Sequence, residues 1–105
     1  MNVLNLTYYQ NFVTIVECGT ISAASRKLLI AQPALSAQLK ALEREFGTEL
    51  LERTARKVIL TSAGKILYEK AKHILFLQDD AKKEIVACTR GHSGTLRLGF
   101  PTTLP

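Results

Sequence analysis

Residues 21–46 read ISAASRKLLIAQPALSAQLKALEREF, and this segment predicts two helices joined by a short turn. In its first part, apolar side chains recur with the spacing that places them on one helical face, at Ile21, Ala24 and Leu28. The small Ala23 and Ala24 allow another helix to pack closely. We therefore expect a short helix that starts near Thr20–Ser22 and forms the first half of a helix-turn-helix.

The turn and the second helix follow directly. The connection over residues 29–32 is short, and Pro33 comes next, in the first turn of a helix, where its missing N–H costs nothing. The predicted helix runs to about Phe46 and ends at Gly47. We expect one buried stripe on it, made of Leu35, Leu39, Leu42 and Phe46.

A further helix is predicted before this unit and a hairpin after it. Residues 6–17 carry apolar side chains at helical spacing, with Asn5 as the N-cap and Gly19 at the end. Two strand-like runs, residues 50–53 and 58–61, are close enough to form a two-stranded hairpin. A hairpin after a helix-turn-helix is a wing. The predicted fold class is therefore mainly α, a winged helix-turn-helix with three helices and a two-stranded wing.

A long helix is predicted from about Ala63 to Thr89, capped by Thr61 or Ser62. At about 1.5 Å per residue it would span roughly 40 Å. Its apolar seam alternates by four and three residues and consists of Leu67, Ala71, Ile74, Gln78, Ala81, Ile85 and Cys88. This seam predicts a homodimer formed through the helix. The alternative is that the stripe covers only its own domain, but the three short helices and the wing offer too little surface for its far half.

The end of the chain has a different pattern. Gly91, Ser93 and Gly94 interrupt it, and residues 95–100 alternate like the first strand of a further domain. Because one strand cannot form a sheet, we expect the chain to stop just after a domain boundary. The predicted organisation is a winged helix-turn-helix domain over 1–61, a linker and dimerisation helix over 62–90, and the start of a further, truncated domain over 91–105.

Charge and composition narrow the class of partner. Fourteen Lys and Arg against nine Asp and Glu give a net charge of +5, which favours an acidic polymer, although many other soluble proteins carry such a charge. Cys18 and Cys88 have no metal or redox spacing and are interpreted as packing residues in a reducing cytosol. No apolar run approaches the roughly 20 residues needed to span a bilayer, and the first residues do not resemble an export signal. We therefore expect a cytoplasmic protein.

The helix face opposite the leucine stripe predicts a DNA contact. It carries small side chains with cations at its edge, and the candidate residues are Gln32, Pro33, Ala34, Ser36, Ala37 and Lys40. Alanines let the backbone approach the bases and can touch thymine methyl groups, whereas Gln32 and Ser36 can bond base edges or phosphates. The alternative is a solvated polar face.

The wing adds three candidate DNA-binding cations, Arg53, Arg56 and Lys57. Flexible cations on a projecting hairpin can follow the phosphate backbone or enter the minor groove, and they supply affinity without reading sequence. The alternative is a charged turn that keeps the protein soluble. The position beside a helix-turn-helix favours the DNA contact.

The sequence gives no pattern for catalysis. It contains no nucleophile with a base, no paired carboxylates on a cleft, no phosphate-binding glycine motif and no metal spacing. His73 lies within the long helix and His92 in a linker, so we interpret both as solvated or packing residues. We therefore expect a protein that is not an enzyme and uses no cofactor or metal.

The order of these segments and the residues within them resemble those of the LysR-type transcriptional regulators. The resemblance is carried by Phe12, Glu17, Gly19-Thr20, Ala23-Ala24, Leu28, Gln32-Pro33-Ala34-Leu35-Ser36, Gln38, Leu39, Leu42-Glu43, Gly47, Leu50-Leu51-Glu52-Arg53, Leu60-Thr61 and Ala63-Gly64. It extends from about Leu6 through the long helix, and the strand that follows looks like the start of the family's effector domain.

This resemblance implies a repressor or activator that binds interrupted palindromes in double-stranded DNA as a dimer, with antiparallel linker helices. Full-length members commonly form tetramers and bind a small-molecule effector in a second domain. Carried over by position, Gln32, Pro33, Ala34, Ser36 and Ala37 would enter the major groove, while Arg53 and Arg56 would hold the wing to the backbone.

Three positions depart from the family pattern. Ala31 replaces the usual Ser or Thr before Gln-Pro, which removes a helix cap worth about 1 kcal/mol. Ala37 replaces a long polar side chain, so a methyl contact is expected there instead of direct base reading. Leu51, where Phe is favoured, is a tolerable core change.

Two other functions fit the same elements. In one, the basic faces bind an acidic protein and the long helix recruits a partner, which predicts little salt-dependent affinity for duplex DNA. In the other, a winged helix binds RNA, but the chain has no aromatic stacking platform for that purpose.

Overall fold

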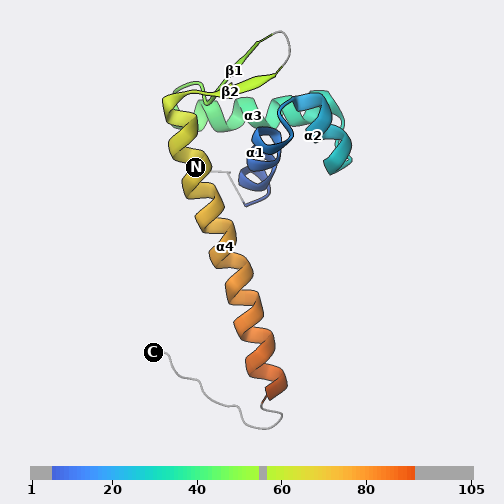
Figure 1. Cartoon of the computed structure of the whole chain (residues 1–105), viewed down its shortest axis with the longest axis vertical. Helices are drawn as coiled ribbons and strands as arrows, with labels where there is room; N and C mark the ends of the chain where they lie inside the picture. The colour runs from blue at the N-terminus through green and yellow to red at the C-terminus, as the bar shows by residue number, and fades with distance from the viewer. Residues whose placement is uncertain (1–5, 55–56, 92–105) are drawn as a thin grey trace. The chain divides into compact units, whose positions relative to one another are not determined.

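The computed structural model describes residues 6–54 and 57–91 of the chain. The elements are α1 (Leu6–Cys18), α2 (Ile21–Leu28), α3 (Gln32–Phe46), β1 (Leu51–Arg53), β2 (Val58–Leu60) and α4 (Ser62–Gly91). The predicted fold class, a winged helix-turn-helix followed by a long helix, is confirmed (Figure 1). Three predicted features lie outside the described residues: the Asn5 cap, the position of Arg56 and the strand over residues 95–100.

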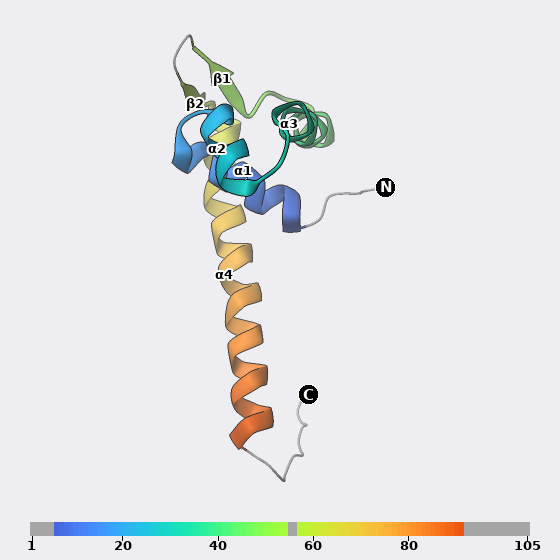
Figure 2. The ribbon, with the colours of Figure 1, turned by 90° about the vertical axis from the view of Figure 1, so that its right-hand side faces the viewer.

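By the contacts between its residues the chain divides into two units, Met1–Leu75 and Phe76–Pro105. The first unit holds α1, α2, α3, the hairpin and the beginning of α4, and α1 packs on α2, α3 and β2 (Figure 2). In the second unit, α4 continues to Gly91.

The core of the first unit forms where the apolar stripes of its helices meet. Its largest fully buried side chains are Phe12, Ile15, Leu35, Leu42 and Leu50. The predicted stripe on α3 is correct for its first three leucines, but Phe46 is 46% exposed. Phe46 is the last residue of α3 and lies at the edge of an apolar hollow that the described chain leaves open, so it was wrongly predicted to be buried.

The helix ends follow the expected local chemistry. Thr20 Oγ1 accepts a hydrogen bond from Ala23 N at 3.0 Å and so caps α2. Gly47 ends α3 with φ +70°, in the left-handed region that glycine adopts without strain. At the end of α2 this conformation falls on Leu29 instead, with φ 58° and 90% of its surface exposed.

The wing is a two-stranded antiparallel sheet with Leu51 opposite Leu60 and Arg53 opposite Val58. Val58 N donates to Gly19 O at 2.9 Å, which attaches the wing to the turn between α1 and α2. Each strand is one residue shorter than predicted. Leu50 and Thr61 continue the same register, and Thr61 N donates to Leu50 O at 3.1 Å. Leu50 N bonds a side-chain carboxylate instead of Thr61 O, so this last pair is incomplete.

Helix α4 starts in close contact with the wing. Thr61 Oγ1 accepts a hydrogen bond from Gly64 N at 2.9 Å and is the N-cap. A Cβ added at Gly64 would overlap the carbonyl oxygen of Leu50, so only glycine allows this approach.

Candidate nucleic-acid interface

The candidate DNA-contacting residues of α3 lie mostly at the surface. Five of the six candidate residues, Gln32, Pro33, Ala34, Ala37 and Lys40, are exposed, and Ser36 is half-buried. Pro33, Ala37 and Lys40 lie on the opposite side of the helix from the buried leucines, and Gln32, Ala34 and Ser36 lie at the flanks of that side, near the start of the helix. Small side chains therefore line a convex surface that a DNA groove could receive.

The N-terminus of α3 has no side-chain cap. Ala31 occupies the N-cap position and makes no such hydrogen bond, because its methyl side chain has no acceptor atom. Pro33 also has no N–H to donate. The N–H groups of Gln32 and Ala34 therefore point toward solvent at the positive end of the helix, where a phosphate oxygen binds favourably.

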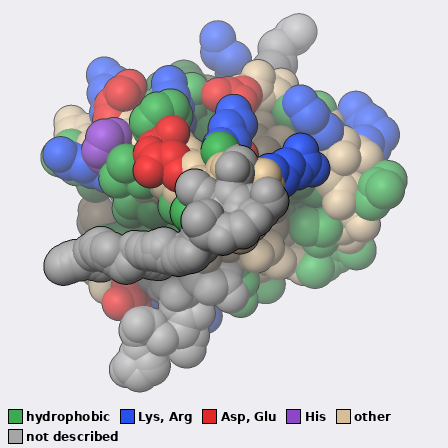
Figure 3. All heavy atoms as spheres, turned by 90° about the horizontal axis from the view of Figure 1, so that it is seen from below, with side chains coloured by type: hydrophobic (Ala, Val, Ile, Leu, Met, Phe, Trp, Pro, Cys, Tyr) green, Lys and Arg blue, Asp and Glu red, His purple; other side chains and the backbone are tan. Residues whose placement is uncertain are grey.

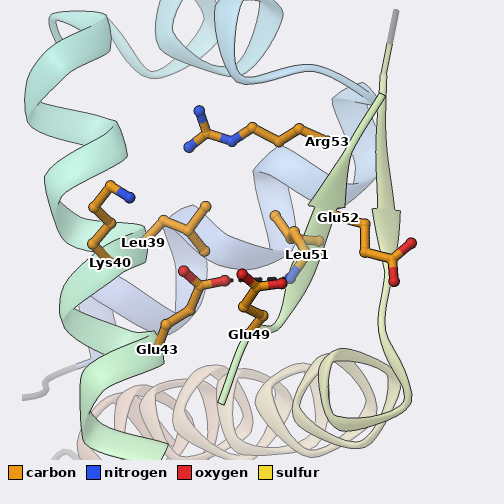
Figure 4. A pocket seen from close by; sticks show the side chains of 7 residues that line it. All are labelled: Leu39, Lys40, Glu43, Glu49, Leu51, Glu52 and Arg53. Atoms are coloured by element: carbon orange, nitrogen blue, oxygen red, sulfur yellow. Dashed lines mark hydrogen bonds between the residues drawn. The ribbon is translucent and has the colours of Figure 1, made fainter. Parts of the chain in front are cut away.

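A polar hollow separates α3 from β1 (Figure 4). Lys40 and Arg53 extend into its mouth from opposite walls, whereas the carboxylates of Glu43 and Glu49 lie together at its other end, and Glu52 points away (Figure 4). The cationic end is suited to a phosphate between the two elements.

Glu43 connects the recognition helix to the wing. Its Oε2 accepts hydrogen bonds from Leu50 N at 2.8 Å and from Leu51 N at 3.4 Å. The spacing between α3 and β1 is therefore set by a charged acceptor on α3. This role of Glu43 does not follow from the residue pattern, whose only signal for it is the Leu42-Glu43 pair within the family resemblance.

A second hollow lies where the starts of α2 and α3 meet the wing. It is lined by Thr20, Ile21, Ser22, Gln32, Arg53, Thr54 and Lys57. Arg53 borders both hollows, so its charge can act on a ligand in either of them. Of the three predicted wing cations, Arg53 and Lys57 are exposed, and Arg56 lies outside the described residues.

The predicted seam of α4 has two different environments. Leu67 and Ala71 are buried in the core of the first unit. Ile74, Gln78, Ala81 and Ile85 are exposed. Leu77, which the heptad assignment omitted, is 50% exposed and lies on the face that carries Ile74 and Ala81.

An apolar hollow in the first unit is lined by Tyr9, Phe46, Thr48, Leu50, Ala63, Ile66, Leu67, Lys70 and Ile74. Hydrophobic side chains also reach the surface among charged ones in the space-filling view (Figure 3).

The two cysteines differ. Cys18 is partly buried and packs against the core, as predicted. Cys88 is exposed, so it is not a packing residue within the chain, and the prediction was wrong on that point. Along the described ranges 6–54 and 57–91, no His, Cys, Asp and Glu side chains gather into a group able to hold a metal ion. Within those ranges no helix is both long and apolar enough to cross a membrane.

The geometry agrees with a known family. Residues 6–65 match the model of the bacterial regulatory helix-turn-helix proteins of the lysR family. This chain is a member of the lysR family. The matched segment includes α1, α2, α3, the wing and the start of α4, which together are the DNA-binding domain of that family.

Curated relatives of this lysR-family chain are transcription regulators. It is 41% identical over 100 residues to the regulator TfdT of Cupriavidus pinatubonensis, covering 95% of this chain and 42% of that protein. It is 43% identical over 100 residues to the nitrogen assimilation regulatory protein nac of Escherichia coli, covering 95% of this chain and 32% of that protein. The chain thus spans less than half the length of these relatives.

Solved lysR-family structures have the same fold. The DNA-binding domain of BenM in complex with catB site 1 DNA matches with a TM-score of 0.80 and 37% identity, over 85% of this chain and 96% of that one. The regulator CbnR matches with a TM-score of 0.78 and 34% identity, over 84% of this chain and 30% of that one.

Proposed function

We propose that this chain binds double-stranded DNA sequence-specifically, as the N-terminal part of a bacterial lysR-family transcription regulator. Helix α3 enters the major groove and the wing contacts the flanking backbone or the minor groove. The observation that carries the proposal is the small-residue face of α3, which is flanked by two hollows that share Arg53.

The residues divide into two roles. Gln32, Pro33, Ala34, Ser36 and Ala37 meet base edges, with Gln32 and Ser36 as hydrogen-bonding groups and the alanines as methyl contacts. Lys40, Arg53, Arg56 and Lys57 neutralise phosphates, which raises affinity for every sequence. The backbone N–H groups at the exposed start of α3 are further donors to phosphate oxygens.

The proposed DNA-binding unit is a homodimer on an interrupted palindrome. Ile74, Gln78, Ala81 and Ile85 form the partner-facing seam together with Leu77, whereas Leu67 and Ala71 contribute mainly to their own core. The exposed apolar side chains at heptad spacing on α4 support a second copy of α4 as the covering element. The antiparallel direction is carried over from the family.

The whole protein is proposed to have the organisation expected from the sequence. Residues 1–61 bind DNA, residues 62–90 form the linker and dimerisation helix, and residues 91–105 begin an effector-binding domain. The full-length regulator would act in the cytoplasm without catalysis, bind a small-molecule effector and assemble as a tetramer. A full-length relative, LysG from Corynebacterium glutamicum, is known with bound effector Arg, which supports the effector role.

Fluorescence anisotropy tests the proposal. A duplex is first selected from a random library by the chain, and its binding is then compared with that of a scrambled duplex across a salt series. Arg53→Ala should weaken binding to both duplexes and flatten the salt dependence, whereas Gln32→Ala should mainly reduce the preference for the selected duplex. No binding to any duplex at low salt would support the protein-interaction alternative instead.

A further inference from the structure

A buried amide pair joins α1 to the recognition helix. Asn11 is only 3% exposed, and its Nδ2 donates a hydrogen bond to Gln38 Oε1 at 2.6 Å. Asn11 and Ser25 are the buried polar residues of the described chain, and the side-chain hydroxyl of Ser25 bonds within α2, to Ser22 O. The Asn11–Gln38 bond therefore stands out because it crosses between two helices.

Gln38 is on α3, but it does not belong to the proposed DNA face. At about 100° per residue, Gln38 lies roughly 60° from Leu35 on one flank of the buried stripe, and Glu43 lies roughly 80° from it on the other flank. Gln38 bonds α1, and Glu43 bonds the backbone of Leu50 and Leu51. Helix α3 is thus held by directional hydrogen bonds on both sides of its apolar stripe.

We infer that the Asn11–Gln38 hydrogen bond sets the rotation of α3 about its own axis, and that Asn11 is a positioning residue for sequence discrimination. This inference rests on the proposed DNA binding by α3. Apolar contacts alone define the helix rotation loosely, because leucine side chains can repack at small cost. A hydrogen bond between two amide groups tolerates much less displacement.

The effect on the opposite face follows from geometry. A side-chain tip lies about 5–6 Å from the helix axis, so a rotation of about 10° moves it by roughly 1 Å. A shift of that size exceeds the range of good hydrogen-bond lengths. The base-facing groups of Gln32 and Ser36 would lose their alignment, whereas flexible phosphate-binding cations such as Lys40 would adapt. Loss of the amide pair should therefore reduce discrimination more than general affinity.

The test uses Asn11→Leu and Gln38→Met, which remove the hydrogen bond from either side while keeping similar volume. Both variants are titrated against the duplex selected by the unsubstituted chain and against its scrambled counterpart, well below the unfolding midpoint. The ratio of the two affinities should fall about tenfold, the size of one good base contact. Affinity for the scrambled duplex should change less than about twofold. The double variant should lose no more than either single variant, since both remove one interaction.

Ser25→Ala is the matched control. Ser25 is 8% exposed and its hydroxyl donates to Ser22 O at 2.8 Å, so the variant also loses a buried hydrogen bond. The affinity ratio should not change in this control, even if the chain becomes less stable.

Other outcomes overturn the inference. An unchanged affinity ratio in the folded variants would refute it, as would an equal loss in Ser25→Ala. A loss in Gln38→Met but not in Asn11→Leu would show that Gln38 itself reads a base. If circular dichroism shows that Asn11→Leu does not fold, Asn11→Ala takes its place, so that a variant on α1 still separates positioning from base reading by Gln38. Failure of the unsubstituted chain to select any duplex would refute the proposed function instead.

Discussion

The two ends of α4 have the same apolar periodicity but different surroundings. Leu67 and Ala71, near its start, are buried in the core of the first unit. From Phe76 to Arg90, every side chain except that of Asp80 is exposed. The comparison teaches that a heptad pattern identifies a face that must be covered but not the element that covers it. We therefore expect the first end of α4 to support the fold and the second end to support association.

The largest effect is expected for Leu67→Ala. Removing a buried leucine side chain should lower the free energy of unfolding by about 3 kcal/mol through lost burial and a residual cavity. The matched variant is Leu77→Ala, since Leu77 is 50% exposed and should contribute less than about 0.5 kcal/mol in the monomer. Urea denaturation at concentrations where sedimentation shows a monomer provides the measurement. Equal losses in the two variants would remove the distinction between the ends.

Gly64→Ala should have the next largest effect. The new Cβ would overlap Leu50 O, so the start of α4 must move away from the wing at a cost of about 2 kcal/mol. Gly47→Ala serves as the control, because it meets no neighbour and its left-handed φ costs only about 1 kcal/mol. Thermal unfolding of both variants gives the comparison. A smaller loss at Gly64 than at Gly47 would mean that this close approach does not stabilise the fold.

Ile85→Ala tests the exposed end. Ile85 and Phe76 are each 62% exposed, but they lie on opposite faces of α4. Ile85→Ala should raise the dissociation constant of the dimer about tenfold, equivalent to about 1.4 kcal/mol, and leave monomer stability nearly unchanged. Phe76→Ala should not alter association. Sedimentation equilibrium measures both, and a stronger effect from Phe76 would assign the interface to the other face.

The smallest difference concerns the two cysteines. Cys88 is exposed and Cys18 is partly buried, so in dilute solution a thiol reagent should modify Cys88 about tenfold faster than Cys18. Raising the protein concentration should slow the reaction of Cys88 as the dimer covers its face, while Cys18 stays unaffected. Mass spectrometry of single-cysteine variants follows each site. A concentration-independent rate at Cys88 would place it outside the interface.

Local signals predicted most of the fold. Helical periodicity, the Thr20 cap, Pro33 in the first turn and Gly47 at the end place the helices within about two residues, because short-range chemistry dictates them. The exposed face of α3 could be predicted in the same way, since it consists of the helix positions that the leucine stripe does not occupy.

The remaining features depend on distant parts of the chain. Phe46 continues the stripe by spacing, but no described element covers it. The strand ends shorten because Glu43, on another element, binds Leu50 N. The Asn11–Gln38 bond joins positions 27 residues apart, and a sequence pattern does not indicate which amide side chains meet in a core.

Leu29 has a consequence for engineering this chain. Its side chain is 90% exposed and its backbone is left-handed, so it contributes no burial while it raises the conformational energy by about 1–2 kcal/mol. Asn tolerates this conformation better, and no core contact would be lost by introducing it. The turn of the helix-turn-helix is therefore where thermal tolerance can be increased most simply, leaving the leucine stripe and the face of α3 as they are.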